Sequence, residues 1–354
     1  MPDRAVWEGR RVWLTGHTGF KGAWLALWLQ SLGAEVHGFS ADLVSEPSLY
    51  ELAAVADGMA GEVRGDVRSK GEVRAAVARA RPDVAFHLAA QAIVRRGLAK
   101  PVETFMVNVA GTAKVLDALR SEAAPAAVVV ATSDKCYRND GSGTPFREDD
   151  PLGGDDPYSA SKAAQEHAAG AFRALGLPLA TMRAGNVIGG GDWAPDRLVA
   201  DCMRAALAGA PVALRAPDAV RPWQHVLGPL EGYLLVAERL LAGDADAATA
   251  WNLGPAADDA QPVGRVVERI ATRWPGGLEV HAATDGAAAG EPPVLRLDAT
   301  RARTRLGWAP RWDLDAAVDA TVAWYAAFRD GTDMRERTLE QIAAYERTAA
   351  PGTV

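Results

Sequence analysis

The 354-residue sequence predicts an α/β protein, with a doubly wound parallel sheet in its first half and a smaller C-terminal α/β lobe. Short apolar runs rich in β-branched residues alternate with longer helical patterns, and such alternation is typical of right-handed βαβ units. After about residue 185, glycine and proline become frequent and the alternation ends. We therefore expect a first domain over residues 1–185. Residues 186–354 would form mainly a substrate-binding lobe, with some segments returning to the first domain.

The expected elements follow from two periodicities, because buried strands give short apolar runs and helices repeat every 3.6 residues. Strands are expected at residues 11–15, 34–39, 62–65, 84–88, 127–131, 179–183 and 249–253. Helices are expected at residues 20–31, 70–80, 101–120, 157–175, 226–241, 262–273, 314–329 and 334–345.

Composition excludes several functional classes. A net charge of −7 argues against a nucleic-acid partner, which would require a basic face. The first residues have no signal-peptide core, and every apolar stretch is too short to span a membrane. Cys136 and Cys202 form no CxxC pair and fit a reducing compartment, so we expect a cytoplasmic protein. The six histidines show no metal-ligand spacing, and no metal is predicted.

A glycine-rich turn, TGHTGFKG at residues 15–22, joins the first expected strand to the first helix. Such a turn lets backbone N–H groups and the helix N-terminus approach a pyrophosphate, as in Rossmann-type dinucleotide-binding domains. The alternative is a plain strand-to-helix turn that needs glycine for its φ angles. The predicted cofactor-binding residues of this turn are Gly16, Thr18, Gly19, Phe20, Lys21 and Gly22.

The residues after the second and third strands bear on which dinucleotide binds. Asp42 lies a few residues too late to be a clear ribose ligand, and no arginine stands there to meet a 2′-phosphate, which favours NAD over NADP. Asp66, followed by Val67, could hydrogen-bond the adenine amino group. The alternative for Asp66 is a turn or helix cap.

Tyr158 and Lys162 form a YxxxK pair on an expected helix, where residues four apart share one face. An ammonium beside the phenol would favour the phenolate, and lowering a tyrosine pKa from about 10 to near 7 requires roughly 4 kcal/mol. Such a phenolate could accept a proton from a sugar hydroxyl. The alternative is a surface tyrosine with a solvated lysine.

A polar segment follows the strand expected at residues 127–131. It contains Ser133, Asp134 and Lys135, and ligands of open parallel sheets bind beyond the carboxyl ends of strands. A hydroxyl, a carboxylate and an amine would therefore lie at the edge of an active site. The alternative is a capped loop with a local ion pair.

These motifs together resemble the extended short-chain dehydrogenase/reductase superfamily and, within it, the CDP-glucose 4,6-dehydratases. The general marks are the glycine-rich turn, HLAAQ at residues 87–91, NVAGT at 108–112 and the YxxxK pair. The narrower marks are TGHTGFKG at 15–22, TSDKCY at 132–137, RAGNVIGGGDWAPDRL at 183–198 and RPWQHVLGPL at 221–230. The resemblance covers nearly the whole chain.

The resemblance implies an NAD-dependent dehydration of CDP-D-glucose to a 4-keto-6-deoxy sugar. Tyr158, assisted by Ser133 and Lys162, would take the C4 hydroxyl proton. Lys135 would remove the C5 proton, and Asp134 would protonate the departing C6 hydroxyl. Further cofactor contacts implied by the family motifs are Ala89, Ala90, Gln91, Asn108, Tyr158 and Lys162.

The second half would bind the nucleotide sugar, and the predicted substrate residues are Asn186, Arg197, Arg221, Gln224 and His225. Arginine makes bidentate contacts to phosphates, which favours Arg197 and Arg221 for the diphosphate. The alternative for each is a solvated surface arginine, and for Trp223 it is core packing.

Other functions stay open at this point. They are a related epimerase or 4,6-dehydratase that uses a GDP- or dTDP-sugar, and a non-catalytic NAD-binding sensor. The helices at residues 101–120 and 157–175 resemble those that build two-fold dimers in such enzymes, so we expect a homodimer.

Overall fold

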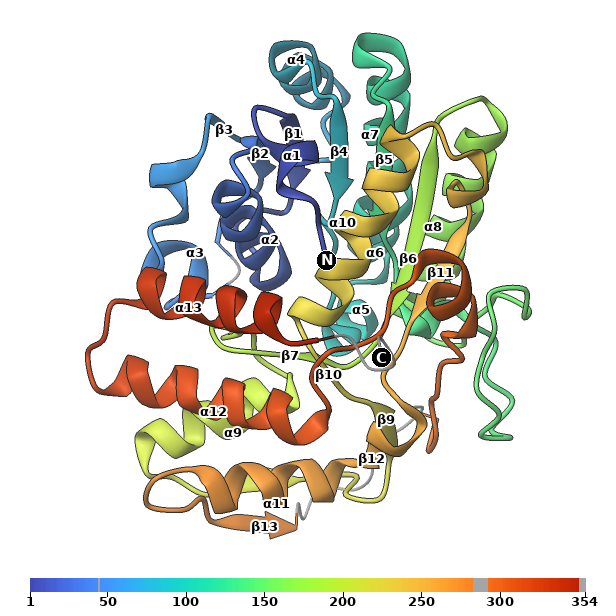
Figure 1. The fold of residues 1–354 in the computed structure, drawn as a ribbon. Helices are drawn as coiled ribbons and strands as arrows, with labels where there is room; N and C mark the ends of the chain where they lie inside the picture. Colours follow the sequence, from blue (N-terminus) through green and yellow to red (C-terminus); the bar gives the residue numbers. More distant parts are fainter. Residues whose placement is uncertain (44, 283–291, 350–354) are drawn as a thin grey trace.

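The computed structural model describes residues 1–43, 45–282 and 292–349. Its central sheet has seven parallel strands in the order β11-β6-β5-β4-β1-β2-β3 (Figure 1). The strands are β1 (Arg11–Thr15), β2 (Glu35–Ser40), β3 (Gly61–Arg64), β4 (Val84–His87), β5 (Ala127–Ala131), β6 (Leu179–Ala184) and β11 (Ala250–Leu253). The predicted fold class is confirmed.

Helices cover both faces of the sheet, as the alternating apolar runs predict. One face carries α2 (Phe20–Ser31), α10 (Leu227–Leu241) and α13 (Met334–Arg347). The other carries α4 (Lys70–Ala80), α7 (Thr112–Ala118) and α8 (Pro157–Ala174). Neighbouring residues of β5 supply the two cores in turn, because Val129 packs in the first cluster and Val128 and Val130 pack in the second.

The helix expected at residues 101–120 is built from several pieces. The regular helices α6 (Pro101–Phe105) and α7 alternate with π-helical turns at Met106–Gly111 and Leu119–Ala123. Shorter helices that periodicity did not predict are α1 (Arg4–Trp7), α3 (Leu49–Leu52) and α5 (Val94–Ala99).

The second half forms a lobe at the end of the sheet toward which the strands point, in the lower part of Figure 1. Its helices are α9 (Leu198–Ala208), α11 (Val263–Arg273) and α12 (Leu314–Arg329). Three small sheets pair β7 (Val187–Ile188) with β10 (Gln224–His225), β8 (Val212–Leu214) with β13 (Val280–Ala282), and β9 (Val220–Pro222) with β12 (Ala260–Pro262).

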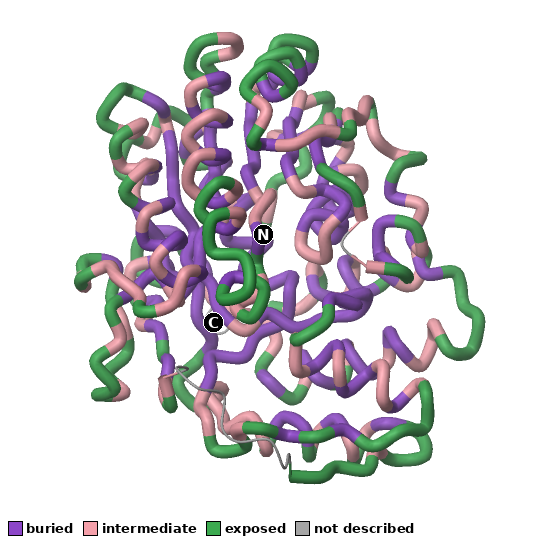
Figure 2. Tube along the Cα trace, turned by 180° about the vertical axis from the view of Figure 1, so that it is seen from behind, coloured by how far each residue is buried: buried purple, intermediate pink, exposed green. Residues whose placement is uncertain are grey.

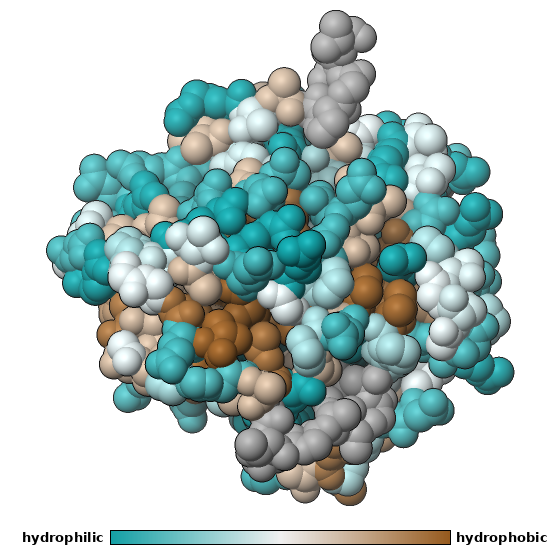
Figure 3. All heavy atoms as spheres, turned by 90° about the horizontal axis from the view of Figure 1, so that it is seen from below, coloured by the Kyte–Doolittle hydropathy of each residue, from teal (hydrophilic) through white to brown (hydrophobic). Residues whose placement is uncertain are grey.

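Parts of this second half return to the sheet. Strand β11 pairs with β6 in parallel register, with Ala250 opposite Thr181, and α10 packs on β5. Seen from behind, buried residues gather in the interior of the molecule and exposed ones lie along its outer turns (Figure 2). Seen from below, the lobe presents mostly hydrophilic side chains, between which apolar ones gather in more than one patch (Figure 3).

Candidate active site

The glycine-rich turn is shaped by close backbone approaches. Gly16 has φ +76°, and a Cβ there would lie 2.7 Å from the amide nitrogen of Ala89. A Cβ at Gly22 would lie 2.0 Å from the carbonyl oxygen of Gly16. Both positions therefore require glycine, which lets α2 begin directly behind β1 with its free N–H groups facing the sheet edge. This backbone cradle fits a dinucleotide pyrophosphate.

The backbone beside the turn, just after β4, is held by Thr15 and His87. The Thr15 hydroxyl accepts from the N–H groups of Leu88 and Ala89 at 3.1 Å and lies 2.7 Å from Nδ1 of His87. Burial, followed by the charge of Lys162, lowers the pKa of His87 to about 3, so the ring is neutral. His87 therefore supports the site structurally.

Asn108 anchors the connection that carries Ala89, Ala90 and Gln91. Its Oδ1 accepts from the Gln91 N–H at 2.8 Å, and its Nδ2 donates to the Gln91 carbonyl at 3.0 Å and to Ser161 Oγ at 2.9 Å. The side chain is fully buried, and these contacts use its amide. Asn108 thus joins the predicted cofactor segment to α8.

At the adenosine end, the structure changes two expectations. Asp66 accepts from the N–H and Nε of Arg68, each at 2.8 Å, so the carboxylate forms the turn cap that was its alternative interpretation. No arginine follows β2 in sequence, yet Arg64 of β3 lies beside its end and donates to the Ala41 carbonyl at 3.3 Å. Arg64 also pairs with Glu62 at 2.6 Å, so its guanidinium is engaged by protein groups.

Ser133, Asp134 and Lys135 follow β5 at the carboxyl edge of the sheet. The Ser133 hydroxyl donates to Asp134 Oδ1 at 3.0 Å and accepts from the Lys135 N–H at 3.1 Å. A Cβ at Gly185 would lie 1.7 Å from Asp134 Oδ2, so glycine is required beneath this carboxyl. Burial raises the pKa of Asp134, although the charges of Lys135 and Arg221 act in the opposite direction.

Tyr158 and Lys162 lie one turn apart at the start of α8, and both are buried. Asp156 caps the helix by accepting from the N–H groups of Tyr158 and Ser159 at 2.8 and 3.0 Å. The Lys162 amine donates to Gln165 Oε1 at 2.9 Å. The motif therefore sits on one helix face beside the loop after β5, as expected.

The electrostatics of this pair differ from the expectation. Burial raises the pKa of Tyr158 to about 12, and the groups that lower it are the Ser133 hydroxyl and Arg197 rather than Lys162. Burial, with the charge of Lys21, lowers the pKa of Lys162 to about 7. The predicted lowering of the tyrosine pKa by the lysine is thus wrong for this arrangement, because desolvation outweighs the attraction.

Lys21 and Arg197 belong to the same cluster. Burial, followed by the charge of Arg197, lowers the pKa of Lys21 to about 8. Arg197 lies 3.8 Å from Asp192. Arg221 is buried, and its positive charge lowers the pKa of Asp134, which places it near the same edge. Both predicted phosphate-binding arginines, Arg197 and Arg221, therefore lie near the catalytic candidates.

The other predicted substrate residues divide. Asn186 follows β6 and has φ +40°, and its carbonyl accepts from the Gln224 N–H at 3.3 Å. The Gln224 side chain donates to the Leu253 carbonyl at 2.7 Å, so it supports the turn from within.

His225 lies in the core, with its ring packed edge-on against Trp24 and Trp312. Its Nδ1 accepts from the Leu227 N–H at 3.3 Å, so the predicted substrate contact is replaced by a packing role. The Trp223 indole donates to the Gln261 carbonyl at 2.9 Å and is 3% exposed, which is the packing role named as its alternative.

Several residues of the site were missed by sequence reasoning. They are Gln165, which holds Lys162; Gly185, which makes room for Asp134; and the buried pair Glu166 and Arg183. A glutamate inside an apolar strip of helix and an arginine inside a strand were available signals, because buried charges are rare unless paired.

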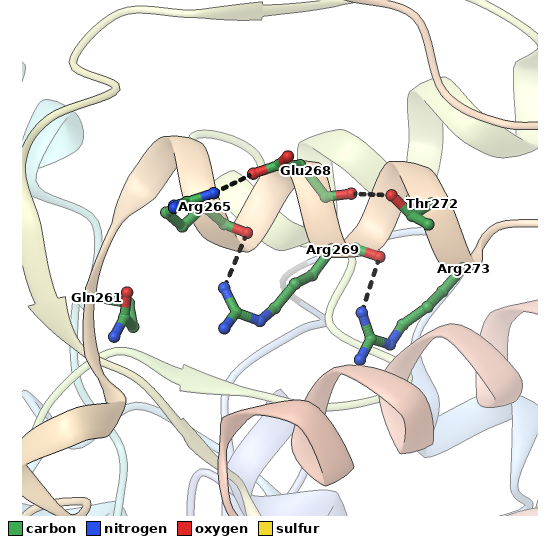
Figure 4. A pocket seen from close by; sticks show the side chains of 6 residues that line it. All are labelled: Gln261, Arg265, Glu268, Arg269, Thr272 and Arg273. Atoms are coloured by element: carbon green, nitrogen blue, oxygen red, sulfur yellow. Dashed lines mark hydrogen bonds and ion pairs between the residues drawn. The ribbon is translucent and has the colours of Figure 1, made fainter.

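A shallow cavity of about 380 Å³ lies elsewhere, along α11. Figure 4 shows Arg265, Arg269 and Arg273 along one side of this helix, with Glu268 and Thr272 beside them. It is remote from the glycine-rich turn and from the YxxxK pair.

Over residues 1–43, 45–282 and 292–349, no cluster of three or more potential metal ligands occurs. No helix in these ranges is long and apolar enough to cross a membrane.

Fold and site together define a Rossmann-fold enzyme of the extended short-chain dehydrogenase/reductase class. The family model of GDP-mannose 4,6-dehydratase matches residues 14–321, and the chain belongs to this family of nucleotide-sugar 4,6-dehydratases. It is 42% identical to a CDP-glucose 4,6-dehydratase of Salmonella typhimurium, over 98% of both chains. A dTDP-glucose 4,6-dehydratase of Streptomyces griseus is 32% identical over 70% of this chain and 73% of its own length.

Solved structures agree with this assignment. A UDP-glucose 4-epimerase of Thermus thermophilus in complex with NAD has a TM-score of 0.78 at 26% identity, covering 89% of this chain and 99% of its own. A UDP-glucose 4-epimerase of Brucella ovis, also with NAD, has a TM-score of 0.78 at 23% identity, covering 90% and 98%, and supports the fold. The predicted family and cofactor agree with these findings.

Proposed function

We propose that this enzyme dehydrates CDP-D-glucose to CDP-4-keto-6-deoxy-D-glucose. The observation that carries the proposal is the 42% identity to a CDP-glucose 4,6-dehydratase over 98% of both chains. Relatives that act on dTDP-glucose are 26–32% identical and cover 70–89% of this chain. The base preference follows from this difference.

The glycine-rich turn fits NAD, since the close backbone approaches at Gly16 and Gly22 place the free N–H groups at the start of α2 at the sheet edge, where they can bind a pyrophosphate. When bound, NAD supplies the oxidising equivalent that removes hydride from C4 of the sugar and returns it at C6. The chain's own residues hold the cofactor through the turn at residues 16–22 and through the segment with Ala89, Ala90 and Gln91.

Burial raises the pKa of Tyr158 to about 12, so Tyr158 would accept the C4 hydroxyl proton in its phenolate form, which the charge of Arg197 and the positive nicotinamide ring of bound NAD would favour. The Ser133 hydroxyl lies beside it to share that hydrogen bond. Burial lowers the pKa of Lys162 to about 7, so the amine carries its charge most fully at pH values below 7, and it donates to Gln165 Oε1 at 2.9 Å. In its deprotonated form, Lys135 removes the C5 proton that the C4 ketone makes acidic. Burial raises the pKa of Asp134, which favours its protonated form, and in that form Asp134 would deliver a proton to the departing C6 hydroxyl.

Arg197 and Arg221 neutralise the diphosphate from the side of the second lobe. Both lie within electrostatic reach of catalytic candidates, since the charge of Arg197 opposes the raised pKa of Tyr158 and the charge of Arg221 opposes that of Asp134. Asn186, at the turn after β6, would contact the diphosphate or the sugar.

The test is incubation of the purified enzyme with CDP-, dTDP- and GDP-glucose separately, with mass spectrometry of each product. Loss of one water from CDP-glucose, faster than from the others, is the expected result. Loss of water only from another nucleotide sugar would overturn the base preference. An isomer of unchanged mass would indicate an epimerase.

We also propose a homodimer built on α6 and α8. Leu98, Val102, Phe105 and Met106 are large apolar residues that are 39–75% exposed along this side. Ala164 and Ala168 of α8 are half-buried, which would permit close helix approach. Sedimentation at micromolar concentration should give twice the 37.3 kDa chain mass, and the single-chain mass would contradict the dimer.

For location we propose the cytoplasm, supported by Cys136 and Cys202, which are both buried free thiols. Labelling of two thiols per unfolded chain without prior reduction is the expected result. A disulfide in the isolated protein would contradict it.

A further inference from the structure

The loop at residues 132–137, which carries the catalytic candidates, is held at both ends by buried polar side chains. Thr132 precedes Ser133, and Tyr137 follows Lys135 and Cys136. The side chains of both end residues reach the same buried ion pair, formed by Glu166 of α8 and Arg183 of β6. The exposed fractions of these two side chains are 3% and 5%.

The carboxylate end of the pair holds the start of the loop. Glu166 Oε1 accepts from the Thr132 hydroxyl at 2.5 Å, while Oε2 accepts from Thr181 Oγ1 and Arg183 Nη2, each at 2.8 Å. Burial raises the pKa of Glu166, but the hydrogen bond and charge of Arg183 outweigh it and leave the pKa below its ordinary value. The pair is therefore ionised and its oxygens are satisfied.

The guanidinium end holds the far side of the loop. Arg183 Nη1 donates to the Tyr137 hydroxyl and to the Glu148 carbonyl, each at 2.8 Å. Its guanidinium carbon lies 5.0 Å from the centre of the Tyr137 ring. Tyr137 in turn donates to Asn252 Oδ1 at 2.6 Å, on the neighbouring strand β11.

The middle of the loop, the short 3-10 turn at Asp134–Cys136, packs against α8 and also makes contacts within the loop. Ser133 Oγ accepts from the Lys135 N–H within the loop, and Asp134 Oδ2 has no hydrogen-bond partner among the described residues. The positions of Ser133 and Asp134 therefore depend on the packing of the loop against α8 and on where the two ends of the loop are fixed. A misplacement of about 1 Å can cost about 100-fold in rate.

We propose that Glu166 and Arg183 are positioning residues that set the geometry of Ser133, Asp134 and Lys135 without touching the substrate. This proposal rests on the proposed dehydratase function for the roles of those three residues. It assigns to one buried ion pair the spacing of the whole active-site loop.

The first test is Glu166→Gln, a nearly isosteric change that removes the charge. We expect kcat to fall about 10–100-fold, because the loop is misplaced. The KM for the nucleotide sugar and the affinity for NAD should stay within about threefold, because their binding residues lie mainly on other segments.

The matched control is Glu231→Gln. Glu231 is also a buried glutamate that pairs with an arginine, Arg311 at 2.8 Å, and with a tyrosine hydroxyl, Tyr345 at 2.8 Å, but it lies away from the active-site loop. Its kcat should stay within about twofold of the wild type at a temperature where both variants are folded. An equal loss of kcat in both variants would overturn the proposal.

Thr132→Val tests the same contact between the loop and Glu166, and it can be measured if Glu166→Gln does not fold, since it removes one hydroxyl and keeps the shape of the side chain. We expect a smaller loss of kcat. If Glu166→Gln does fold, the double variant should be no slower than Glu166→Gln alone. Additive losses of kcat would mean that the two groups act separately and would contradict a shared positioning role.

Hydrogen exchange of the backbone separates this proposal from the proposed function. In Glu166→Gln or Thr132→Val, the amides of residues 133–137 should exchange at least about tenfold faster, whatever substrate the enzyme uses. Unchanged exchange in this loop would overturn the positioning role. A wild-type enzyme that dehydrates no nucleotide sugar would instead overturn the function alone.

Discussion

Two regions of the molecule that bury charge differ in how well neighbouring groups compensate it. Around Glu231, Arg311 donates to the carboxylate at 2.8 and 3.0 Å and Tyr345 donates at 2.8 Å, so the buried charge is paired and hydrogen-bonded. At the carboxyl edge of the sheet, burial lowers the pKa of Lys162 to about 7 and raises that of Asp134.

This difference separates buried charges that stabilise the fold from buried charges that take part in proton transfer. A buried ion pair whose hydrogen bonds are all made joins two segments at little cost in stability. A buried charge that its surroundings disfavour costs stability, but its pKa then lies nearer the pH at which the group must donate or accept a proton. Asp134 and Lys162 are held in place by the fold, against their own preference for water.

The largest effect should come from Tyr158→Phe. Removal of the phenol should lower turnover by about 1,000-fold or more, since a positioned acid–base group contributes about 10²–10⁴-fold. NAD binding, measured by quenching of tryptophan fluorescence, should be unchanged. Tyr345→Phe removes an equally buried phenol from the compensated region and should retain turnover; comparable loss in both would refute the assignment.

Asp134→Asn should lower turnover about 100-fold and make stability depend less on pH. Because its folded-state pKa is raised, the wild-type carboxyl contributes stability below its ordinary pKa of 3.8 that is lost as pH rises through the folded value. The melting temperature of the variant minus that of the wild type should therefore be larger at pH 8 than at pH 4. A difference in melting temperature that is the same at both pH values would count against the raised pKa.

Glu231→Gln should give the opposite pattern, lower stability with retained turnover. Breaking a buried pair by removing one charge costs about 3–5 kcal/mol, because Arg311 is left uncompensated. Urea unfolding measures this loss. A change below about 1 kcal/mol would show that the region is less buried in solution than in the structure.

The smallest effect should come from the exposed ion pairs of α11. Arg273 pairs with Asp315 at 2.6 Å, but the Asp315 side chain is 55% exposed. Arg273→Gln should change the free energy of unfolding by about 0–1 kcal/mol, less at high salt, with turnover unaffected. Reduced turnover would give the cavity along this helix a role in the reaction.

The sequence predicted the elements whose side chains repeat regularly. The apolar run AVVVA became β5, and helices α11 and α12 lie within a residue of their expected bounds. Tyr158 and Lys162 were found because their spacing alone places them on one helix face.

What the sequence could not show is contact between distant segments. Arg64 reaches the end of β2 only because Ser40 lies opposite it in the β2–β3 register. Glu166 and Arg183 are 17 residues apart on a helix and a strand, and no periodic pattern joins them. The pKa of Tyr158 depends on burial, which a helical motif does not reveal.

The place of β11 at the outer end of the sheet has a consequence for synthesis on the ribosome. Strand β6 is made about 70 residues before its partner β11, counted from residues 184 and 253, so it emerges with an unpaired row of backbone amides and carbonyls. A shortened chain that stops near residue 185 would keep this edge open and would be prone to pair with other copies of itself. The two halves of the gene product are therefore a poor choice for separate expression, although the glycine-rich turn and the YxxxK helix lie wholly in the first.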